Sequence, residues 1–177
     1  EIAHRKNCRP DIESIDKALQ KNFSVKKENL LTTIKKFRKL LQKIAEKEWT
    51  KITPKYDVRI IETPKYLVPF IPTAAMNSFA SLTKNPFCVF FATTDAKGSP
   101  SNCLPDLLQT IIHEEYGHCV NFENSFTNFV EKLRIIEVLE SSLSTPTTEG
   151  ISFHRELESL EYFKSSLVFS QCRNIYS

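Results

Sequence analysis

The sequence predicts an α+β fold in which helices predominate. Apolar residues recur at helical spacing in the first fifty residues and again from residue 104 onward, with two short β-branched or aromatic runs between them. Glycine is rare, at 3 of 177 residues, which argues against glycine-rich phosphate-binding loops. The expected order is a helical hairpin, a short strand pair and a three-helix region. Because two strands alone form a marginal sheet, we expect the chain to be part of a larger fold.

The first fifty residues show two amphipathic patterns. A helix is predicted over residues 10–23, which open with a Pro-Asp start signal. Ser24 can cap a longer helix over residues 24–52, which ends before a Thr-Pro pair. We therefore predict a basic amphipathic helical hairpin over residues 1–52 and a second domain over residues 53–177. The apolar stripe of the longer helix consists of Leu30, Ile34, Phe37, Leu41, Ile44 and Trp49.

Positive charge is concentrated in the first part of the chain. Residues 1–66 hold 17 Lys or Arg against 9 Asp or Glu, and residues 67–177 hold 7 against 12, so that +8 and −5 give the net +3. A basic half is compatible with nucleic-acid binding. However, the lysines lie opposite the apolar stripe without aromatic residues among them, which is typical of a solvated helix face. We therefore expect no nucleic-acid partner and keep a helical interaction module with a basic face as an alternative.

The middle of the chain mixes strand patterns with an irregular segment. Residues 56–62 alternate and are β-branched, and residues 86–94 are apolar and aromatic, so each run predicts a strand. Residues 63–78, between them, hold three prolines and are expected to be an irregular connection.

Helical spacing returns after residue 104. Helices are predicted over residues 105–124, 125–144 and 149–170, and the Thr-Pro-Thr-Thr run at residues 145–148 is expected to separate the last two. Proline and aspartate near the start of the first of these helices fit its amino-terminal turn. The residues expected to form its buried side are Leu108, Ile111, Ile112 and Tyr116.

Cysteine content and hydropathy limit the cellular setting. The five cysteines lie far apart without a CxxC pair, which is typical of free thiols in a reducing compartment. No run approaches the roughly 18 apolar residues of a membrane span, so no membrane partner is expected. No signal peptide is recognisable in this chain, and we expect a cytoplasmic location.

The stretch TIIHEEYGHCVNF, residues 110–122, holds His113 and His118, two of the four histidines. In a regular helix, five residues correspond to about 500° of rotation, which would turn the two rings roughly 140° apart. A one-residue π-bulge realigns them, and Gly117 tolerates the backbone geometry that such a bulge requires. Two aligned imidazoles with a carboxylate are typical zinc ligands, so the motif predicts a metal site. On spacing alone, two ordinary structural histidines are the alternative.

The other site residues follow from this chemistry. Glu114 would act as the general base that takes a proton from an activated water. Glu149 is predicted as the third ligand because it begins a separate helix, and Glu156, two turns further on, is the alternative. His154 is a weaker candidate for stabilising an oxyanion, and a surface position is favoured for it. Among the neighbours we expect a solvated Glu115, a core Tyr116 and a buried structural thiol at Cys119.

The motif HEEYGH has the HExxGH spacing of dipeptidyl-peptidase III, a zinc peptidase. The surrounding sequence resembles the domain of unknown function 885, a family of zinc peptidases with HEAYPGHHLQ at the motif and EGWALYAE in a later helix. Here the second stretch reads EGISFHRE, from Glu149 to Glu156. The stretches VRIIETPKYLVPFIPTAAMNS, FCVFFATT and LPDLLQTIIHEEYGH are similar in the same order, so the resemblance covers about residues 50–165.

This resemblance implies a gluzincin-like zinc metallopeptidase that cleaves peptides or oligopeptides by water attack. The zinc ligands would be His113, His118 and Glu149, with Glu114 as the general base. The stretch FCVFFATT would be the edge strand that pairs with an extended substrate. This chain lacks the family's proline before the motif glycine. The alternative is a truncated or non-catalytic relative that still binds metal; the oligomeric state is not predicted.

Overall fold

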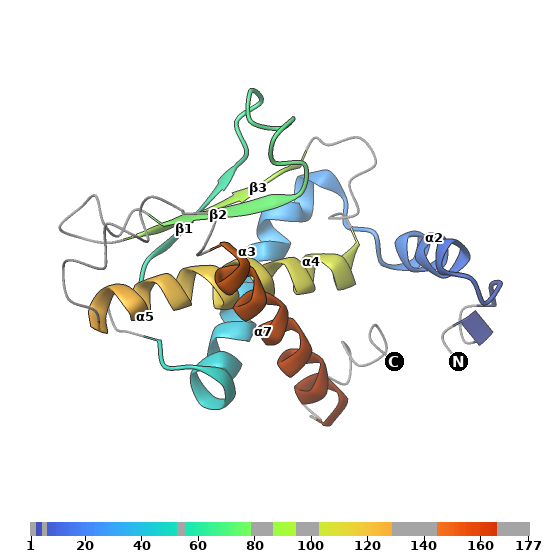
Figure 1. The fold of residues 1–177 in the computed structure, drawn as a ribbon. Helices are drawn as coiled ribbons and strands as arrows, with labels where there is room; N and C mark the ends of the chain where they lie inside the picture. The colour runs from blue at the N-terminus through green and yellow to red at the C-terminus, as the bar shows by residue number, and fades with distance from the viewer. Residues whose placement is uncertain are drawn as a thin grey trace.

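The computed structural model describes residues 3–4, 7–52, 56–78, 87–94, 103–128 and 145–165. It is α+β with helix predominating, as predicted. A three-stranded sheet lies along a continuous helical segment, residues 104–128. The helix of residues 27–44 crosses behind this segment, and the helix of residues 145–165 crosses in front of it (Figure 1). The elements are α2 (Ile12–Phe23), α3 (Lys27–Ile44), the π-helix η1 (Ala45–Trp49), β1 (Val58–Glu62), β2 (Ala74–Ser78), β3 (Cys88–Ala92), α4 (Leu104–Ile111), the π-helix η3 (Ile112–Cys119), α5 (Val120–Asn128) and α7 (Thr145–Ser165).

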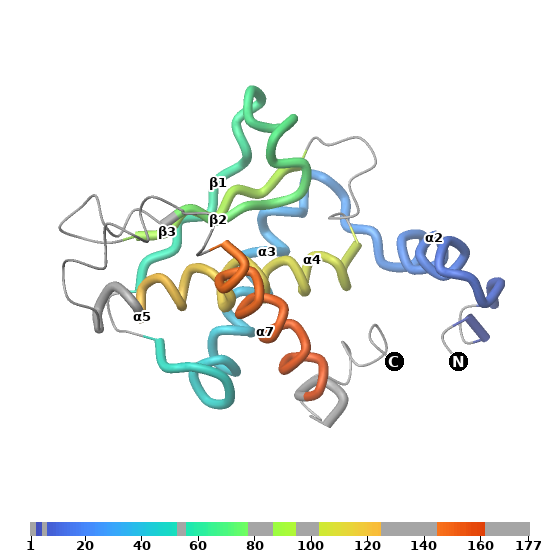
Figure 2. The backbone as a smooth tube through the Cα atoms, viewed as in Figure 1, coloured from blue at the N-terminus to red at the C-terminus, as the bar shows by residue number. Residues whose placement is uncertain are grey.

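Helix α2 forms where the sequence predicts it but buries none of its residues. The Asp11 side chain caps it by accepting a hydrogen bond from the Ser14 N–H at 2.8 Å. Ile12, at its start, is 89% exposed. The helix extends away from α3 (Figure 2). Both predicted helices are therefore present, but α2 does not contribute to the core.

Helix α3, in contrast, supplies much of the hydrophobic core. Its predicted stripe is buried or partly buried and meets residues of β3, α4 and η3 in one cluster. This core therefore extends across the expected domain boundary at residue 52. The predicted capping role of Ser24 is wrong: Lys26 is the N-cap residue and makes no side-chain cap hydrogen bond. Ser24 instead forms an isolated bridge with Cys103.

The sheet has the strand order β1-β3-β2, with β1 parallel and β2 antiparallel to β3. Strand β2 lies in the segment that was expected to be irregular, and that expectation is wrong for residues 74–78. Its Ala, Met, Asn and Ser residues have weak strand preference, and pairing with β3 overrides it. The expectation that FCVFFATT forms an edge strand is also wrong. Because β3 is central, with four of its five residues buried, β1 and β2 are the edges.

Helices α4, η3 and α5 follow one another without a break and form the helical rod. Helix α7 crosses the rod and packs most extensively against η3. The expected break at residues 145–148 is wrong, because α7 begins at Thr145 and includes the Thr-Pro-Thr-Thr run. A proline is tolerated there because the first turn of a helix needs no backbone donor. Residues 129–144, most of another predicted helix, lie outside the described part of the chain.

Two of the cysteines are not free thiols. Cys88 of β3 and Cys119 of η3 are joined as a disulfide, with their Cα atoms 6.2 Å apart, whereas Cys8 and Cys103 are free. The expectation of free thiols is therefore wrong for this pair, because the packing of β3 on η3 brings together positions 31 residues apart. None of the described helices is long and apolar enough to cross a membrane.

Candidate metal centre

The two motif histidines lie on a π-helix, as the five-residue spacing predicts. Helix α4 starts with a proline in its first turn and continues as regular α-helix to Ile111. Over the next eight residues the backbone is π-helical, a longer segment than the single bulge that was expected. The rings of His113 and His118 consequently lie side by side, with centroids 5.0 Å apart and planes at 75°.

Gly117 is required by a close approach between helices. A Cβ atom at this position would lie 2.2 Å from Ser152 Oγ and 2.5 Å from both Ser152 Cα and Cβ. The backbone of Gly117 is not in the left-handed region. The expected backbone role is therefore replaced by a steric one, because the missing side chain allows α7 to approach η3.

Glu149 lies where the third ligand was predicted. One of its carboxylate oxygens is 3.2 Å from His113 Nε2 and the other is 3.3 Å from His118 Nε2. One ligand atom from each of the three residues lies within 4.8 Å of the others, so His113, His118 and Glu149 form a group that could hold a metal ion. The Glu149 side chain is 42% exposed, which leaves this side of the group open to solvent.

Glu156 lies on the other side of the His113 ring and is not a member of this group. Its Oε1 is 2.5 Å from His113 Nδ1, and Gln109 donates a hydrogen bond to its second oxygen. A carboxylate at Nδ1 favours the tautomer with hydrogen on that nitrogen. The Nε2 lone pair of His113 is then directed toward Glu149. Glu156, the alternative third ligand, thus contacts the Nδ1 side of His113 and does not join the group.

His118 is held by polar and aromatic contacts. Ser152 Oγ lies 3.3 Å from both ring nitrogens and donates a hydrogen bond to the Thr148 carbonyl oxygen at 3.1 Å. Its lone pairs can therefore accept a hydrogen bond from His118. The Phe122 ring stacks on the imidazole at a centroid distance of 6.2 Å. His154, the weaker candidate, is exposed on α7 and lies outside the group.

Glu114 points from η3 toward strand β2. The Met76 N–H donates a hydrogen bond to Glu114 Oε2 at 2.9 Å. Burial, with a smaller contribution from the nearby Glu149, raises the pKa of Glu114 to about 7, although His113 and the Met76 N–H act in the opposite direction. A half-buried carboxylate therefore lies next to the possible metal ligands, held by a backbone donor.

Glu115 was expected to be solvated, and this expectation is wrong. It is 0% exposed, and Arg38 of α3 pairs with both of its oxygens at 2.5 Å. The Tyr56 hydroxyl donates a third hydrogen bond at 3.2 Å. Burial raises the pKa of Glu115, and Arg38 opposes this shift. One sequence feature could have indicated the pair: Arg38 lies four residues after Ile34 and therefore on the buried stripe of α3.

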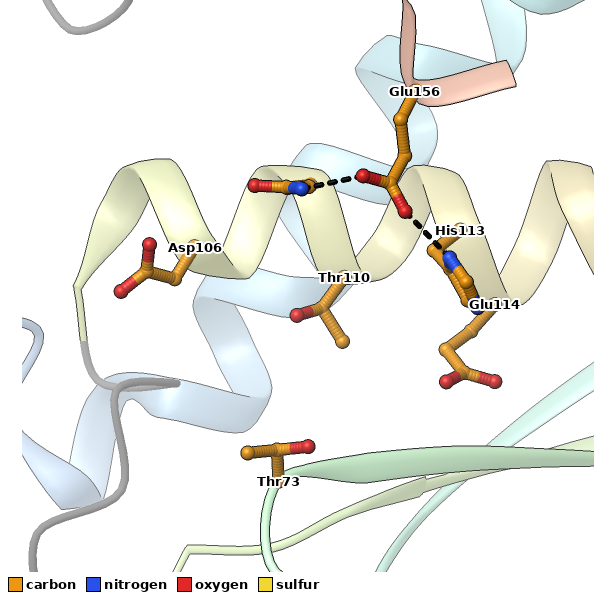
Figure 3. A pocket seen from close by; sticks show the side chains of 7 residues that line it. Thr73, Asp106, Thr110, His113, Glu114 and Glu156 are labelled. Atoms are coloured by element: carbon orange, nitrogen blue, oxygen red, sulfur yellow. Dashed lines mark hydrogen bonds and ion pairs between the residues drawn. The ribbon is translucent and has the colours of Figure 1, made fainter. Parts of the chain in front are cut away.

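A pocket of about 330 Å³ adjoins the metal-ligand group (Figure 3). It lies between the start of β2, the rod and α7. The residues that line it are Thr73, Asp106, Gln109, Thr110, His113, Glu114 and Glu156. The possible metal ligand His113 therefore borders a space large enough for part of a ligand.

Comparison with protein-family models, with curated proteins and with solved structures finds no match for this chain. Its function must therefore be argued from the geometry of the site.

Proposed function

We propose that this chain is a zinc-dependent peptidase in which His113, His118 and Glu149 hold the ion and Glu114 is the general base. The observation that carries the proposal is the convergence of two imidazole Nε2 atoms and a carboxylate from a different helix within 4.8 Å.

The donor set fits zinc. Catalytic zinc sites commonly combine two histidines and a glutamate and leave a further position open. The carboxylate of Glu156 at His113 Nδ1 is the usual partner of a metal-binding imidazole, since it fixes the tautomer and makes the other nitrogen a better donor. The exposure of Glu149 and the adjoining pocket supply the access that water and a substrate need.

Bound zinc would supply Lewis acidity, which polarises a peptide carbonyl and lowers the pKa of water. The side chain of Glu114 is suited to hold the proton that the attacking water loses and to pass it to the leaving amine. The Met76 N–H binds one oxygen of this carboxylate, which fixes its orientation and leaves the other oxygen available. Because His113 is the preceding residue, the base and the ligand keep a fixed relation.

Strand β2 offers a place for the peptide backbone. The Thr93 N–H donates to the Thr73 carbonyl oxygen, so residues 73, 75 and 77 are directed toward β3. Ala74 and Met76, which alternate with these residues, therefore direct their backbone N–H and C=O groups away from β3. On that side of β2 the Met76 N–H donates its hydrogen bond to Glu114. An extended peptide that pairs with this edge would lie beside the general base.

Metal content measured by mass spectrometry of the purified full chain tests the ligand set. We expect about one zinc per chain in the wild type and none in the His113→Ala, His118→Ala double variant. His154→Ala is the matched control, because this histidine is exposed and outside the group, and its zinc content should equal that of the wild type. The absence of zinc from the wild type after incubation with zinc would overturn the proposal.

Hydrolysis of a mixture of oligopeptides, followed by mass spectrometry, tests the activity. The zinc-loaded wild type should cleave peptide bonds, and Glu114→Gln should lose cleavage while it keeps zinc, because the amide cannot accept the proton. Zinc binding without cleavage by the wild type would identify a non-catalytic metal-binding protein instead.

A further inference from the structure

The pocket beside the metal-ligand group has an acidic lining. Of the described residues that line it, three carry carboxylates, Asp106, Glu114 and Glu156, and none is a lysine or arginine. Figure 3 shows the carboxylate of Asp106 at the end of the pocket remote from His113. Thr73 and Thr110 lie between these two ends. One end of the pocket is therefore bordered by His113 and Glu114, and the other end is bordered by the Asp106 carboxylate.

The positions of Asp106 and His113 on the rod give the distance between the two ends of the pocket. Asp106, Thr110 and Glu114 recur every four residues, so they share one side of the rod. Seven residues separate Asp106 from His113, which corresponds to roughly 10 Å along a helix. At about 3.3 Å per residue, this distance equals approximately three residues of extended peptide.

The three carboxylates differ in how they are paired. Glu114 binds the Met76 N–H, and Glu156 binds His113 and Gln109. Asp106 is partly buried, and within the described part of the chain no side chain or backbone donor binds its carboxylate. Burial and the neighbouring Asp16 both raise the pKa of Asp106, and no described cation lowers it. Among the described residues, none therefore supplies a positive partner for Asp106 at this end of the pocket.

We propose that Asp106 binds a cationic group of the peptide substrate, either a lysine or arginine side chain or the terminal ammonium group, about three residues of extended chain from the scissile bond. This inference rests on the proposed function for the identification of the ligand as a peptide. The position of Asp106 in the first turn of α4 also favours a negative charge through the helix dipole. That role alone would not make peptide binding depend on charge, so binding measurements distinguish the two.

Peptide binding to the zinc-loaded Glu114→Gln full chain is the test, because this background should not cleave the probe. Three fluorescent peptides of one sequence are compared: acetylated with one lysine, acetylated with norleucine in its place, and the norleucine peptide with a free amino terminus. The lysine position is moved along the peptide. A charge-assisted hydrogen bond predicts that at least one cationic peptide binds roughly tenfold or more tightly than the neutral peptide.

Substitution of the pocket carboxylate tests its role. Asp106→Asn should reduce the preference to less than about threefold, since the amide keeps the size but lacks the charge. Asp106→Glu restores a charge, and should recover part of the preference. Asp57→Asn is the matched control, because Asp57 is an exposed carboxylate outside the pocket lining, and this variant should keep the preference of the wild type. Circular dichroism confirms that each variant is folded.

The outcomes separate this inference from the proposed function. A preference for the lysine peptide identifies a side-chain site, and a preference for the free amine identifies a terminal site; both support the inference. Equal binding of all three peptides, or a preference that survives Asp106→Asn, overturns it. Cleavage of neutral peptides as efficiently as cationic ones by the chain with Glu114 intact would overturn the inference alone. Charge-dependent binding without any cleavage would overturn the proposed function alone.

Discussion

The two sides of the π-helix η3 present neighbouring residues to different environments. On the side of β2 and α7, Glu114 and the two histidines are partly buried; His113 and Glu114 line the pocket, and both histidines face Glu149. On the side of α3, Glu115 and Tyr116 are completely or almost completely buried, and Glu115 has a full set of partners. Glu115 thus joins η3 to Arg38 of α3 and to Tyr56, on the side of the helix away from the metal-ligand group. Variants of the core side should reduce stability, and variants of the open side should reduce metal binding.

The largest expected effect is on the core side. Glu115→Ala leaves Arg38 without its carboxylate in a buried position, which should lower the free energy of unfolding by about 3–5 kcal/mol. Urea denaturation of the zinc-free chain, followed by circular dichroism, measures this change. Glu13→Ala, which breaks an exposed pair with Lys17 on α2, is the control and should change little. A loss below about 1 kcal/mol for Glu115→Ala would show that the buried pair does not stabilise the fold.

The contact between the rod and α7 should respond next. Gly117→Ala introduces a Cβ against Ser152 and should cost about 1–3 kcal/mol. Gly150→Ala, on α7, meets nothing within 4 Å and should be neutral or stabilising by up to about 1 kcal/mol through helix preference. A second change, Ser152→Ala, should not rescue Gly117→Ala, because Ser152 Cα also lies too close. Complete rescue would contradict this explanation.

The open side should give a smaller effect that is confined to metal binding. Glu156→Gln weakens the support of His113 and should reduce zinc affinity about 10–100-fold, with little change in zinc-free stability. Competition with a fluorescent zinc chelator measures the affinity. Glu158→Gln changes another carboxylate of α7, one that pairs with Arg155, and should leave the affinity unchanged. Equal losses in both variants would show that Glu156 has no specific role.

Thiol reactivity should give the smallest effect, and it compares a buried position with a surface one. Burial and Asp106 raise the pKa of Cys103 to about 11, so the thiolate fraction at pH 8 is about 0.1%. Cys8 is only partly buried and should be alkylated at least about tenfold faster. Peptide mapping after limited alkylation without reductant measures both rates and should leave Cys88 and Cys119 unmodified. Rapid labelling of Cys103 would mean that its region opens readily.

The residues that the sequence located correctly are those whose neighbours lie close in the chain. The five-residue spacing of His113 and His118 predicted a π-helical segment because no regular helix could align them. The buried side of α4 and the stripe of α3 followed from periodicity in the same way. Glu149 was predicted from the need for a third ligand on a second helix, and it lies with both histidines in a group that could hold a metal ion.

The residues that were missed depend on partners far away in the sequence. Glu115 looked solvated because its partner Arg38 is 77 residues away. Strand β2 was missed because its residues have weak strand preference and its pairing with β3 is decided by tertiary packing. The start of α7 was misplaced because a proline can either end a helix or occupy its first turn, and only the surrounding fold decides between the two.

The π-helical backbone of η3 also determines the effect of inserting or deleting a residue between the two histidines. A regular helix aligns histidines that are four residues apart, whereas η3 aligns histidines that are five residues apart. Removal of one residue between them, together with the π-helical turn, would leave both imidazoles and all later residues on their present faces. The cost would fall on the core, because Glu115 and Tyr116 both occupy buried positions within that interval. The additional residue therefore lets one short segment serve the metal-ligand group and anchor itself in the core at the same time.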